Sequence, residues 1–296
     1  MVNYTIGLDL GGTRIKVVAI NEKGEILYQA NQPTDDGNDQ VWKNSISSCV
    51  ETVIKELGGN PFVGISAPGL PDATNQCIAF MPGRLQGLEN FNWSNHLQRN
   101  TYVLNDGVAA LMSEAKFGAC KDASHAVLLT LGTGVGGAIL IDGKPYQGAF
   151  NKAGHLGHMV IDNNGEPDVT GMPGSLEECI GNCTIEKRSG GKFTSTHALL
   201  DAYRKNDSYA ADVWLKSIRQ LALGIASISN MLSPQYIVLG GGITEAGDDL
   251  FIPLENFLAL YEWRPGGARS VIKKAEFGGL AGAIGAACFA IEKNKS

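Results

Sequence analysis

Short apolar runs separated by polar turns dominate the N-terminal part of the chain. Tyr4–Leu10, Ile15–Asn21 and Glu25–Gln32 each have the length and composition of a strand, and short turns such as Glu22-Lys23-Gly24 join them. Strands joined by such short turns pair in antiparallel fashion. The pattern therefore predicts an antiparallel three-stranded meander at the start of the chain.

The pattern then becomes helical. Apolar residues from Trp42 to Leu57 recur at helical spacing, and the run ends at a Gly-Gly pair. We expect a buried strand over 62–67, a short strand over 102–104 and a helix from Asn105-Asp106 to about Gly118. Between them, Pro82–Asn95 has the composition of an irregular loop. Meander, helix and strand in this order are typical of an α/β fold.

The order of strand, glycine turn and strand occurs a second time. Ala126–Leu131 precedes Gly132-Thr133-Gly134, and Gly137–Ile141 follows, with a third extended segment expected near Tyr146. Ala138–Gly143 also echoes the pattern of the second N-terminal strand, so the chain is predicted to contain two related halves.

Helical patterns fill much of the remaining chain. We expect a long helix over Ala210–Leu232, a strand over Tyr236–Leu239 that runs into three glycines, and a last helix from about Leu280 to Lys293. The second half thus has the same α/β composition as the first.

Composition narrows the class of partner. With 296 residues, 44% of them hydrophobic, the chain can bury two ordinary cores. A net charge of -6 without runs of Lys or Arg argues against nucleic acid or an anionic membrane surface as the main partner, so we expect a small-molecule substrate. No apolar stretch reaches the roughly 20 residues that span a bilayer, and no basic signal region opens the chain, so we expect a cytoplasmic protein.

The first glycine turn has two interpretations. Gly11-Gly12 between apolar segments is typical of a tight hairpin turn, and the same layout lets backbone N–H groups approach a phosphate closely. Thr13 would add a hydroxyl and Lys16 a cation, while Asp9 at the strand end could hold hydrated Mg²⁺ through water. The motif alone leaves both interpretations open.

The second glycine turn also matches a different nucleotide motif. Gly132–Gly137 fits G-x-G-x-x-G, which in a dinucleotide-binding unit opens a helix. Here a strand follows instead, so that interpretation fails. The remaining hypothesis is a pair of glycine hairpins that face each other across an interdomain cleft and bind phosphate.

Four segments together resemble the ROK family within the sugar-kinase, actin and heat-shock ATPase superfamily. Asp9–Thr13 and Leu131–Gly137 are similar to the two phosphate motifs, Leu239–Gly242 to the adenosine motif and Ala281–Ala287 to the last helix. The resemblance implies two actin-like (ribonuclease H-like) domains with an interdomain cleft. Their expected bounds are 1–119 completed by the C-terminal helix 280–296, and 120–279 for the second lobe.

The resemblance implies ATP-dependent phosphorylation of a hexose or hexose derivative. Glucose, an N-acetylhexosamine and a β-glucoside all fit, with the 6-hydroxyl as the expected acceptor, Mg²⁺ as the metal and a homodimer as the assembly. The nucleotide and its metal would be bound by Asp9, Gly11, Gly12, Thr13, Lys16, Gly132, Thr133, Gly134, Gly240, Gly241 and Gly242.

Asp106 has an ordinary interpretation and a catalytic one. An aspartate before a helical segment is a favoured N-cap. By the resemblance, Asn105-Asp106 matches a pair in which Asp106 accepts the proton of the attacking sugar hydroxyl and Asn105 orients that hydroxyl. Phosphoryl transfer needs positioning, Mg²⁺ and one proton acceptor, so the second interpretation is chemically sensible.

The expected sugar ligands depart from the family at one position. His158 and Glu177 match its histidine and later glutamate, whereas His155 stands where the family has a glutamate. Because an imidazole can donate as well as accept, His155 predicts a changed hydroxyl or anomer preference. Asn90, in the irregular loop, is a further candidate sugar ligand.

The family's structural zinc is not expected here. Its cysteines would fall at Asp168, Thr170 and Ser175, none of which supplies a thiolate. Cys179 and Cys183, with His155 or His158, could form an improvised site, but two reduced core cysteines are the favoured interpretation.

Two alternatives come from other functional classes. The family includes sugar-responsive repressors with a DNA-binding helix-turn-helix ahead of the first phosphate motif, where this sequence has only three residues before the first strand. The other alternative is a sugar sensor that keeps the fold without kinase activity, which His155 alone encourages. The phosphate motifs and Asp106 favour the kinase.

Overall fold

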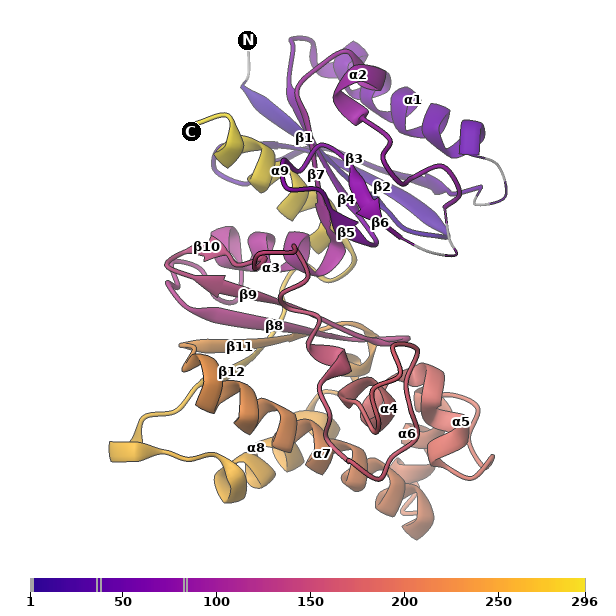
Figure 1. The fold of residues 1–296 in the computed structure, drawn as a ribbon, viewed down its shortest axis with the longest axis vertical. Helices are drawn as coiled ribbons and strands as arrows, with labels where there is room; N and C mark the ends of the chain where they lie inside the picture. The colour runs from indigo at the N-terminus through magenta and orange to yellow at the C-terminus, as the bar shows by residue number, and fades with distance from the viewer. Residues whose placement is uncertain (1–2, 36, 38, 82, 84, 296) are drawn as a thin grey trace. The chain divides into compact units, whose positions relative to one another are not determined.

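The computed structural model describes residues 3–35, 37, 39–81, 83 and 85–295, which are drawn in colour in Figure 1.

The chain divides into two compact units. The first comprises Met1–Asp122, Pro145–Ala153 and Glu276–Ser296, and the second Ala123–Lys144 and Gly154–Ala275. The expected bounds left Pro145–Ala153 in the second lobe. In the structure this segment is part of the first unit, where Asn151 Nδ2 donates to the carbonyl of Pro71 at 3.1 Å.

The first unit is built on a five-stranded sheet of order β3-β2-β1-β4-β7. Strands β1 (Tyr4–Leu10), β2 (Arg14–Asn21) and β3 (Ile26–Pro33) form the predicted antiparallel meander. Strands β4 (Phe62–Ala67) and β7 (Thr101–Asn105) continue the sheet in parallel with β1. The antiparallel and parallel halves therefore meet at β1.

Helices cover both faces of this sheet (Figure 1). Helix α1 (Asp39–Leu57) packs Trp42 and Ile46 into a core that includes Val17 of β2. Helix α9 (Ala281–Lys293) packs instead against the neighbouring residues Val18 and Ile20. Because side chains alternate along a strand, β2 is buried on both faces.

The second unit repeats this topology with a sheet of order β10-β9-β8-β11-β12. Its strands β8 (Ala126–Leu131) and β9 (Val135–Ile141) are antiparallel, and β11 (Tyr236–Gly240) and β12 (Val271–Lys274) run parallel to β8. The third extended segment expected near Tyr146 is only the two-residue β10 (Lys144–Pro145), because proline lacks the N–H that a longer ladder needs. Two related halves of α/β type are thus confirmed.

The long helix of the second unit is α7 (Ser208–Leu232), which runs beside α8 (Asp248–Tyr261) in Figure 1. Trp214 and Ile218 of α7 belong to the same buried cluster as Leu129 of β8 and Leu239 of β11. The remaining elements are β5 (Leu70–Pro71), β6 (Ile78–Phe80), α2 (Trp93–Leu97), α3 (Asp106–Phe117), η1 (Leu156–His158), α4 (Leu176–Ile180), η2 (Asn182–Thr184), α5 (Ile185–Arg188), α6 (Thr196–Arg204), η3 (Gly242–Ala246), η4 (Pro265–Gly267) and η5 (Gly278–Leu280).

One loop prediction needs a correction. The expected loop Pro82–Asn95 ends earlier, because Asn92 accepts from the N–H of Asn95 and caps α2, which begins at Trp93. Pro82 itself lies outside the described residues. Within the part of the chain that the structure describes, no helix combines the length and apolar character needed to cross a membrane.

Glycines allow α9 to lie close to its neighbours in the first unit. A Cβ at Gly7 would overlap the carbonyl of Ala283, and one at Gly64 the carbonyl of Ala286. A Cβ at Gly285 would likewise overlap the backbone of Ala109 in α3. The helix therefore packs backbone against backbone, which only glycine permits at these three positions.

We expect Gly64→Ala to lower the free energy of unfolding by about 1–3 kcal/mol, because the added methyl group forces α9 off the sheet. Urea denaturation followed by tryptophan fluorescence measures the change. Ser48→Ala on the exposed side of α1 is the matched control and should shift it by less than about 0.5 kcal/mol. Equal values for the two variants would contradict the packing argument.

Candidate functional site

The first glycine turn is a closed hairpin turn. The N–H of Gly11 donates to the carbonyl of Arg14 at 3.0 Å, and Thr34 donates from Oγ1 to the carbonyl of Gly11 at 2.8 Å and from its N–H to that of Thr13 at 3.0 Å. The side chain of Thr13 is exposed. The hairpin interpretation thus describes the backbone, and a phosphate-binding role for the same turn stays a prediction.

Asp9 lies at the end of β1 between two polar neighbours. The register of the sheet places it opposite Lys16 on one side and Ser66 on the other. Ser66 donates its hydroxyl to Asp9 Oδ1 at 2.8 Å, and Lys16 Nζ is 3.6 Å from Asp9 Oδ2. With 20% of its side chain exposed, Asp9 can also accept from water.

Asn105, and not Asp106, caps helix α3. Its Oδ1 accepts from the N–H of Gly107 at 2.9 Å, while its Nδ2 donates to the carbonyl of Gly69 at 3.1 Å. The interpretation of Asp106 as N-cap is therefore wrong, because the strand before α3 extends through Asn105. Asp106 is the first helical residue, and its Oδ1 accepts from the same N–H at 2.8 Å.

The pKa of Asp106 lies above the ordinary carboxyl value of 3.8. Desolvation by the surrounding protein is the main cause, and the negative charge of Asp9 adds to it, while the N–H of Gly107 opposes the rise. The side chain keeps an exposed edge all the same. A carboxylate with a raised pKa and an accessible oxygen is suited to accepting a proton.

Asn90 belongs to the first unit and lies in a loop. Its backbone takes the left-handed conformation with φ of 58°, and its N–H donates to the carbonyl of Ile78 at 2.8 Å. The residue is exposed, so its amide is accessible to a ligand.

The second glycine turn is held from outside by the segment after α4. The N–H of Gly132 donates to the carbonyl of Gly134 at 3.0 Å, which closes the turn. The N–H groups of Asn182 and Cys183 donate to the carbonyls of Gly132 and Thr133 at 3.0 and 2.8 Å. Two elements far apart in sequence thus fix the shape of this turn.

Glu177 contacts the same turn. Its Oε2 accepts from the N–H of Val135 at 2.9 Å, and a Cβ at Gly134 would overlap its carboxylate. The glycine at 134 therefore makes room for a side chain as well as turning the chain. The structure brings the predicted sugar ligand Glu177 and the predicted phosphate turn together.

His155 and His158 flank the short 3₁₀ turn η1. Gly157 within it lies so close to β9 that a Cβ would overlap the carbonyl of Val135. His155 is exposed, and desolvation, with a smaller contribution from His158, lowers its pKa below 6.5. The imidazole is therefore mainly neutral at pH 7, with one donor and one acceptor nitrogen.

A cavity of about 590 Å³ opens beside the second glycine turn. Gly132, Thr133 and Gly242 line it, so three of the predicted nucleotide residues share one pocket. Gly240 ends β11, and Gly241 has a φ of 88° and packs against the backbone of Leu131, so these two shape the turn.

Sequence reasoning missed several residues of this cavity, namely Asn182, Thr196, His197, Leu200, Arg204, Ile243, Glu245 and Ala246. Thr196 is 5% exposed, and its hydroxyl has no hydrogen-bond partner among the described residues. A buried hydroxyl without a partner is unfavourable in the free protein, so it is available to a bound ligand. No motif in the sequence distinguishes Thr196 from other helix-opening threonines.

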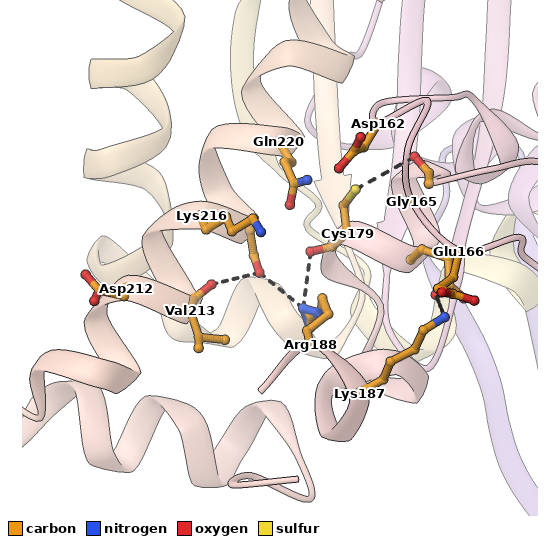
Figure 2. A pocket seen from close by; sticks show the side chains of 13 residues that line it. Asp162, Gly165, Glu166, Cys179, Lys187, Arg188, Asp212, Val213, Lys216 and Gln220 are labelled. Atoms are coloured by element: carbon orange, nitrogen blue, oxygen red, sulfur yellow. Dashed lines mark hydrogen bonds and ion pairs between the residues drawn. The ribbon is translucent and has the colours of Figure 1, made fainter. Parts of the chain in front are cut away.

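A second cavity, of about 290 Å³, lies behind α4 (Figure 2). Figure 2 shows the side chain of Arg188 pointing toward the main chain of Cys179. Its Nη1 donates to the carbonyl of Cys179 at 3.2 Å and to Ser217 Oγ at 3.1 Å, and its Nη2 to the carbonyls of Ile180 and Gly181 at 3.4 and 3.2 Å. Burial lowers its pKa to about 10. Arg188 thus satisfies the C-terminal carbonyls of α4, the helix that carries Glu177.

The three positions expected to lack zinc cysteines form a hydrogen-bonded cluster. Asp168 Oδ1 accepts from the N–H and the hydroxyl of Thr170 at 2.8 and 2.7 Å, and Oδ2 lies 2.8 Å from His158 Nδ1. Cys179 is buried, as expected, but Cys183 is exposed. The prediction of two core cysteines is therefore wrong for Cys183, which lies in the short turn η2 after α4. Within the described ranges, no group of three or more His, Cys, Asp or Glu side chains has the geometry to hold a metal ion.

Many known proteins are similar to this chain in sequence or in structure. A model of the ROK family matches residues 5–293. Glucokinase of Thermotoga maritima is 30% identical over 281 residues, with 86% of this chain and 87% of that protein covered. N-acetyl-D-glucosamine kinase of Haemophilus influenzae is 29% identical over 308 residues, with 97% and 99% covered.

A solved structure extends the likeness to three dimensions. The ROK family glucokinase from Streptomyces griseus, in complex with glucose and AMPPNP, has a TM-score of 0.78 and 26% identity, with 98% of this chain and 100% of that chain covered. The likeness spans both units and confirms the actin-like α/β fold implied by the sequence.

We expect Arg188→Met to lower the free energy of unfolding by about 1–3 kcal/mol, since the carbonyls at the end of α4 lose their donors. Urea denaturation measures the loss. Lys187→Met is the matched control, because Lys187 pairs at 2.8 Å with Glu178 at half exposure and contributes less than about 1 kcal/mol. An Arg188 variant as stable as this control would refute the capping role.

Proposed function

The chain belongs to the ROK family and is an ATP-dependent sugar kinase, and we propose that its acceptor is a hexose or hexose derivative phosphorylated at the 6-hydroxyl. Glucose, an N-acetylhexosamine and a β-glucoside are the candidate acceptors. The Thermotoga maritima and Haemophilus influenzae relatives are named for the first two of these sugars.

The observation that carries the proposal is the carboxylate of Asp106. Its pKa is raised by desolvation and by Asp9, its Oδ1 is bound to one N–H, and part of the side chain is exposed. Such a group can take the proton of a sugar hydroxyl as that hydroxyl attacks the γ-phosphate of ATP. Asn105, held at both ends of its amide, is proposed to fix the direction of the hydroxyl.

We assign nucleotide binding to two sets of residues. In the second unit, Gly132, Thr133 and Gly242 line the 590 Å³ cavity, which we propose accepts the nucleoside. We assign Gly134, Gly240 and Gly241 to the same role because they shape the neighbouring turns. In the first unit, Gly11, Gly12, Thr13 and Lys16 are proposed to meet the phosphates, with Asp9 binding Mg²⁺ through water. The Asp9 carboxylate is partly exposed and suits such an ion, which would neutralise charge on the phosphates.

We propose that the sugar is bound by His155, His158 and Glu177 of the second unit, with Asn90 as a further ligand. Glu177 keeps Oε1 for a hydroxyl while Oε2 is bound to Val135. His155 presents a neutral imidazole where a carboxylate is expected from the family, so it can donate to a sugar oxygen.

The proposal also covers the oligomeric state, the location and the partners of the enzyme. We infer a homodimer in the cytoplasm that acts on small molecules and binds neither nucleic acid nor membrane. The net charge of -6 supports only the part about nucleic acid and anionic membranes, since it disfavours contact with polyanions. Light scattering of the purified protein tests the assembly.

We expect Asp106→Asn to lower kcat by about 10²–10⁴-fold, because the amide cannot accept the proton. Sugar affinity, measured by calorimetry, should change little, since hydrogen bonding by the side chain is largely kept. Asp122→Asn is the matched control, since Asp122 is an exposed aspartate of the same unit, and it should keep full turnover. Full turnover by the Asp106 variant would refute the base assignment.

The pH profile of the unmodified enzyme provides a second readout for the same assignment. The base must be ionised, so kcat should decrease as the pH is lowered and Asp106 takes up its proton. Because the pKa of Asp106 is raised, this decrease should occur at a pH above the ordinary carboxyl value of 3.8. A kcat that stays level below that value would exclude Asp106 as the base.

Screening sugars by coupled ADP release tests the acceptor. We expect turnover with at least one of the three candidate classes, and we expect His155→Glu to change the order of preference among sugars or anomers, because it removes the donor at that position. ADP release with none of them would favour a sensor over a kinase. An unchanged preference in the variant would exclude His155 from the sugar site.

A further inference from the structure

A buried carboxylate organises the loop between η1 and α4. Asp168 Oδ1 accepts three hydrogen bonds, from the N–H of Thr170 at 2.8 Å, its hydroxyl at 2.7 Å and the N–H of Met172 at 3.2 Å. Its Oδ2 lies 2.8 Å from His158 Nδ1. The loop closes around this group, with the N–H of Asp168 donating to the carbonyl of Met172 at 2.9 Å.

The carboxylate is ionised. Its side chain is 0% exposed. Burial by itself would raise the pKa of Asp168, but the hydrogen bonds from Thr170, His158 and Ser175 outweigh it and hold the pKa well below the usual range. An ionised carboxylate only accepts hydrogen bonds.

The state of His158 follows from this chemistry. Because Oδ2 of Asp168 cannot donate, Nδ1 of His158 must carry a proton, and the neutral imidazole then has its lone pair on Nε2. The side chain of His158 is 28% exposed, and its hydrogen bond to Asp168 uses Nδ1, which leaves Nε2 out of that contact. One nitrogen is therefore committed to Asp168, and the other is available.

We propose that Asp168 is a positioning residue, which holds the Nδ1–H of His158 so that Nε2 accepts a hydrogen bond from a hydroxyl of the sugar. The proposal rests on the sugar kinase function proposed above. It also explains how the loop keeps its shape without a metal. Asp168, Thr170 and Ser175 occupy the positions of the family's zinc cysteines, and here hydrogen bonds to the Asp168 carboxylate join the three residues.

A purely structural role for Asp168 is the competing explanation, and Asp168→Asn separates the two. The amide oxygen must stay where Oδ1 is, because two N–H groups and a hydroxyl point at that place. The NH₂ group then faces His158 Nδ1, which must become an acceptor, so the imidazole proton moves to Nε2. Replacing an aspartate that orients a histidine is known to impose the wrong tautomer in this way.

Nitrogen NMR of ¹⁵N-histidine-labelled protein reads the tautomer directly. Of the five histidines, His158 is assigned as the signal that disappears in His158→Gln. We expect the Nδ1–H form in the unmodified protein and the Nε2–H form in Asp168→Asn. An Nε2–H form in the unmodified protein overturns the proposal. Since this measurement needs no turnover, it stands even if the proposed kinase activity fails.

Kinetics then tests the link to the sugar. In Asp168→Asn we expect KM for the sugar to rise about 10-fold, with a smaller change in kcat. A 10-fold effect is at the low end of what the loss of a residue that orients a ligand typically causes. Thr170→Val removes one hydrogen bond to Oδ1 and leaves the His158 contact, so it should lower stability and keep both KM and the tautomer. An equal rise of KM in both variants would show that Asp168 only shapes the loop.

Two controls complete the experiment. Asp142→Asn removes an exposed aspartate whose carboxylate lies 3.6 Å from His125, so it tests the loss of an Asp–His pair elsewhere in the same unit and should leave KM unchanged. Metal analysis of the purified protein should find less zinc than one ion per chain. One bound zinc per chain, lost together with the His158 signal change in Asp168→Asn, would make Asp168 a metal ligand and overturn the proposal.

Discussion

Parallel pairing at the carboxyl end of one central strand is the constraint on which both units depend. In the first unit β1 pairs with the antiparallel β2 on one side and the parallel β4 on the other, and β8 occupies the same position in the second. Parallel strands end at the same edge of a sheet. The polar residues that follow those strands must therefore meet at one edge, whatever their separation in the sequence.

The register shows this directly. Asp9 is opposite Ser66, and the neighbouring Ala67 is opposite Asn105, so the carboxylate of β1 and the residues at the end of β7 share one edge. In the second unit Thr130 is opposite Gly240, which brings the end of β11 beside the second glycine turn. The proposed base and the cavity proposed for the nucleotide thus both lie where strands end.

Two buried charged groups of the second unit, Arg188 and Asp168, are held largely by hydrogen bonds to neutral groups. Arg188 has four oxygen acceptors, three of them carbonyls at the end of α4. Asp168 has donors at both oxygens. Burying a charge is costly unless it is hydrogen-bonded, so these two groups tolerate burial while fixing the backbone around them. Glu177 and His158 take their positions from segments held in this way.

Local pattern alone determined most of the architecture. The alternation over the first three strands predicted the meander, and the repeat of strand, glycine turn and strand predicted two related halves, because periodicity and turn residues act over a few neighbours. The resemblance of four motifs to one family could also be recognised from the sequence. It identified the type of enzyme, which the comparisons support.

Tertiary structure decided what depends on contacts between distant residues. Only the fold shows that Asn105 rather than Asp106 caps α3, that Gly134 makes room for Glu177, and that Thr196 and His197 share a cavity with Gly132. Only the fold pairs His158 with Asp168, ten residues away across a loop without a regular period. Such contacts depend on packing and hydrogen-bond geometry, which no spacing along the chain encodes, whereas the order of strands and helices follows from local preference.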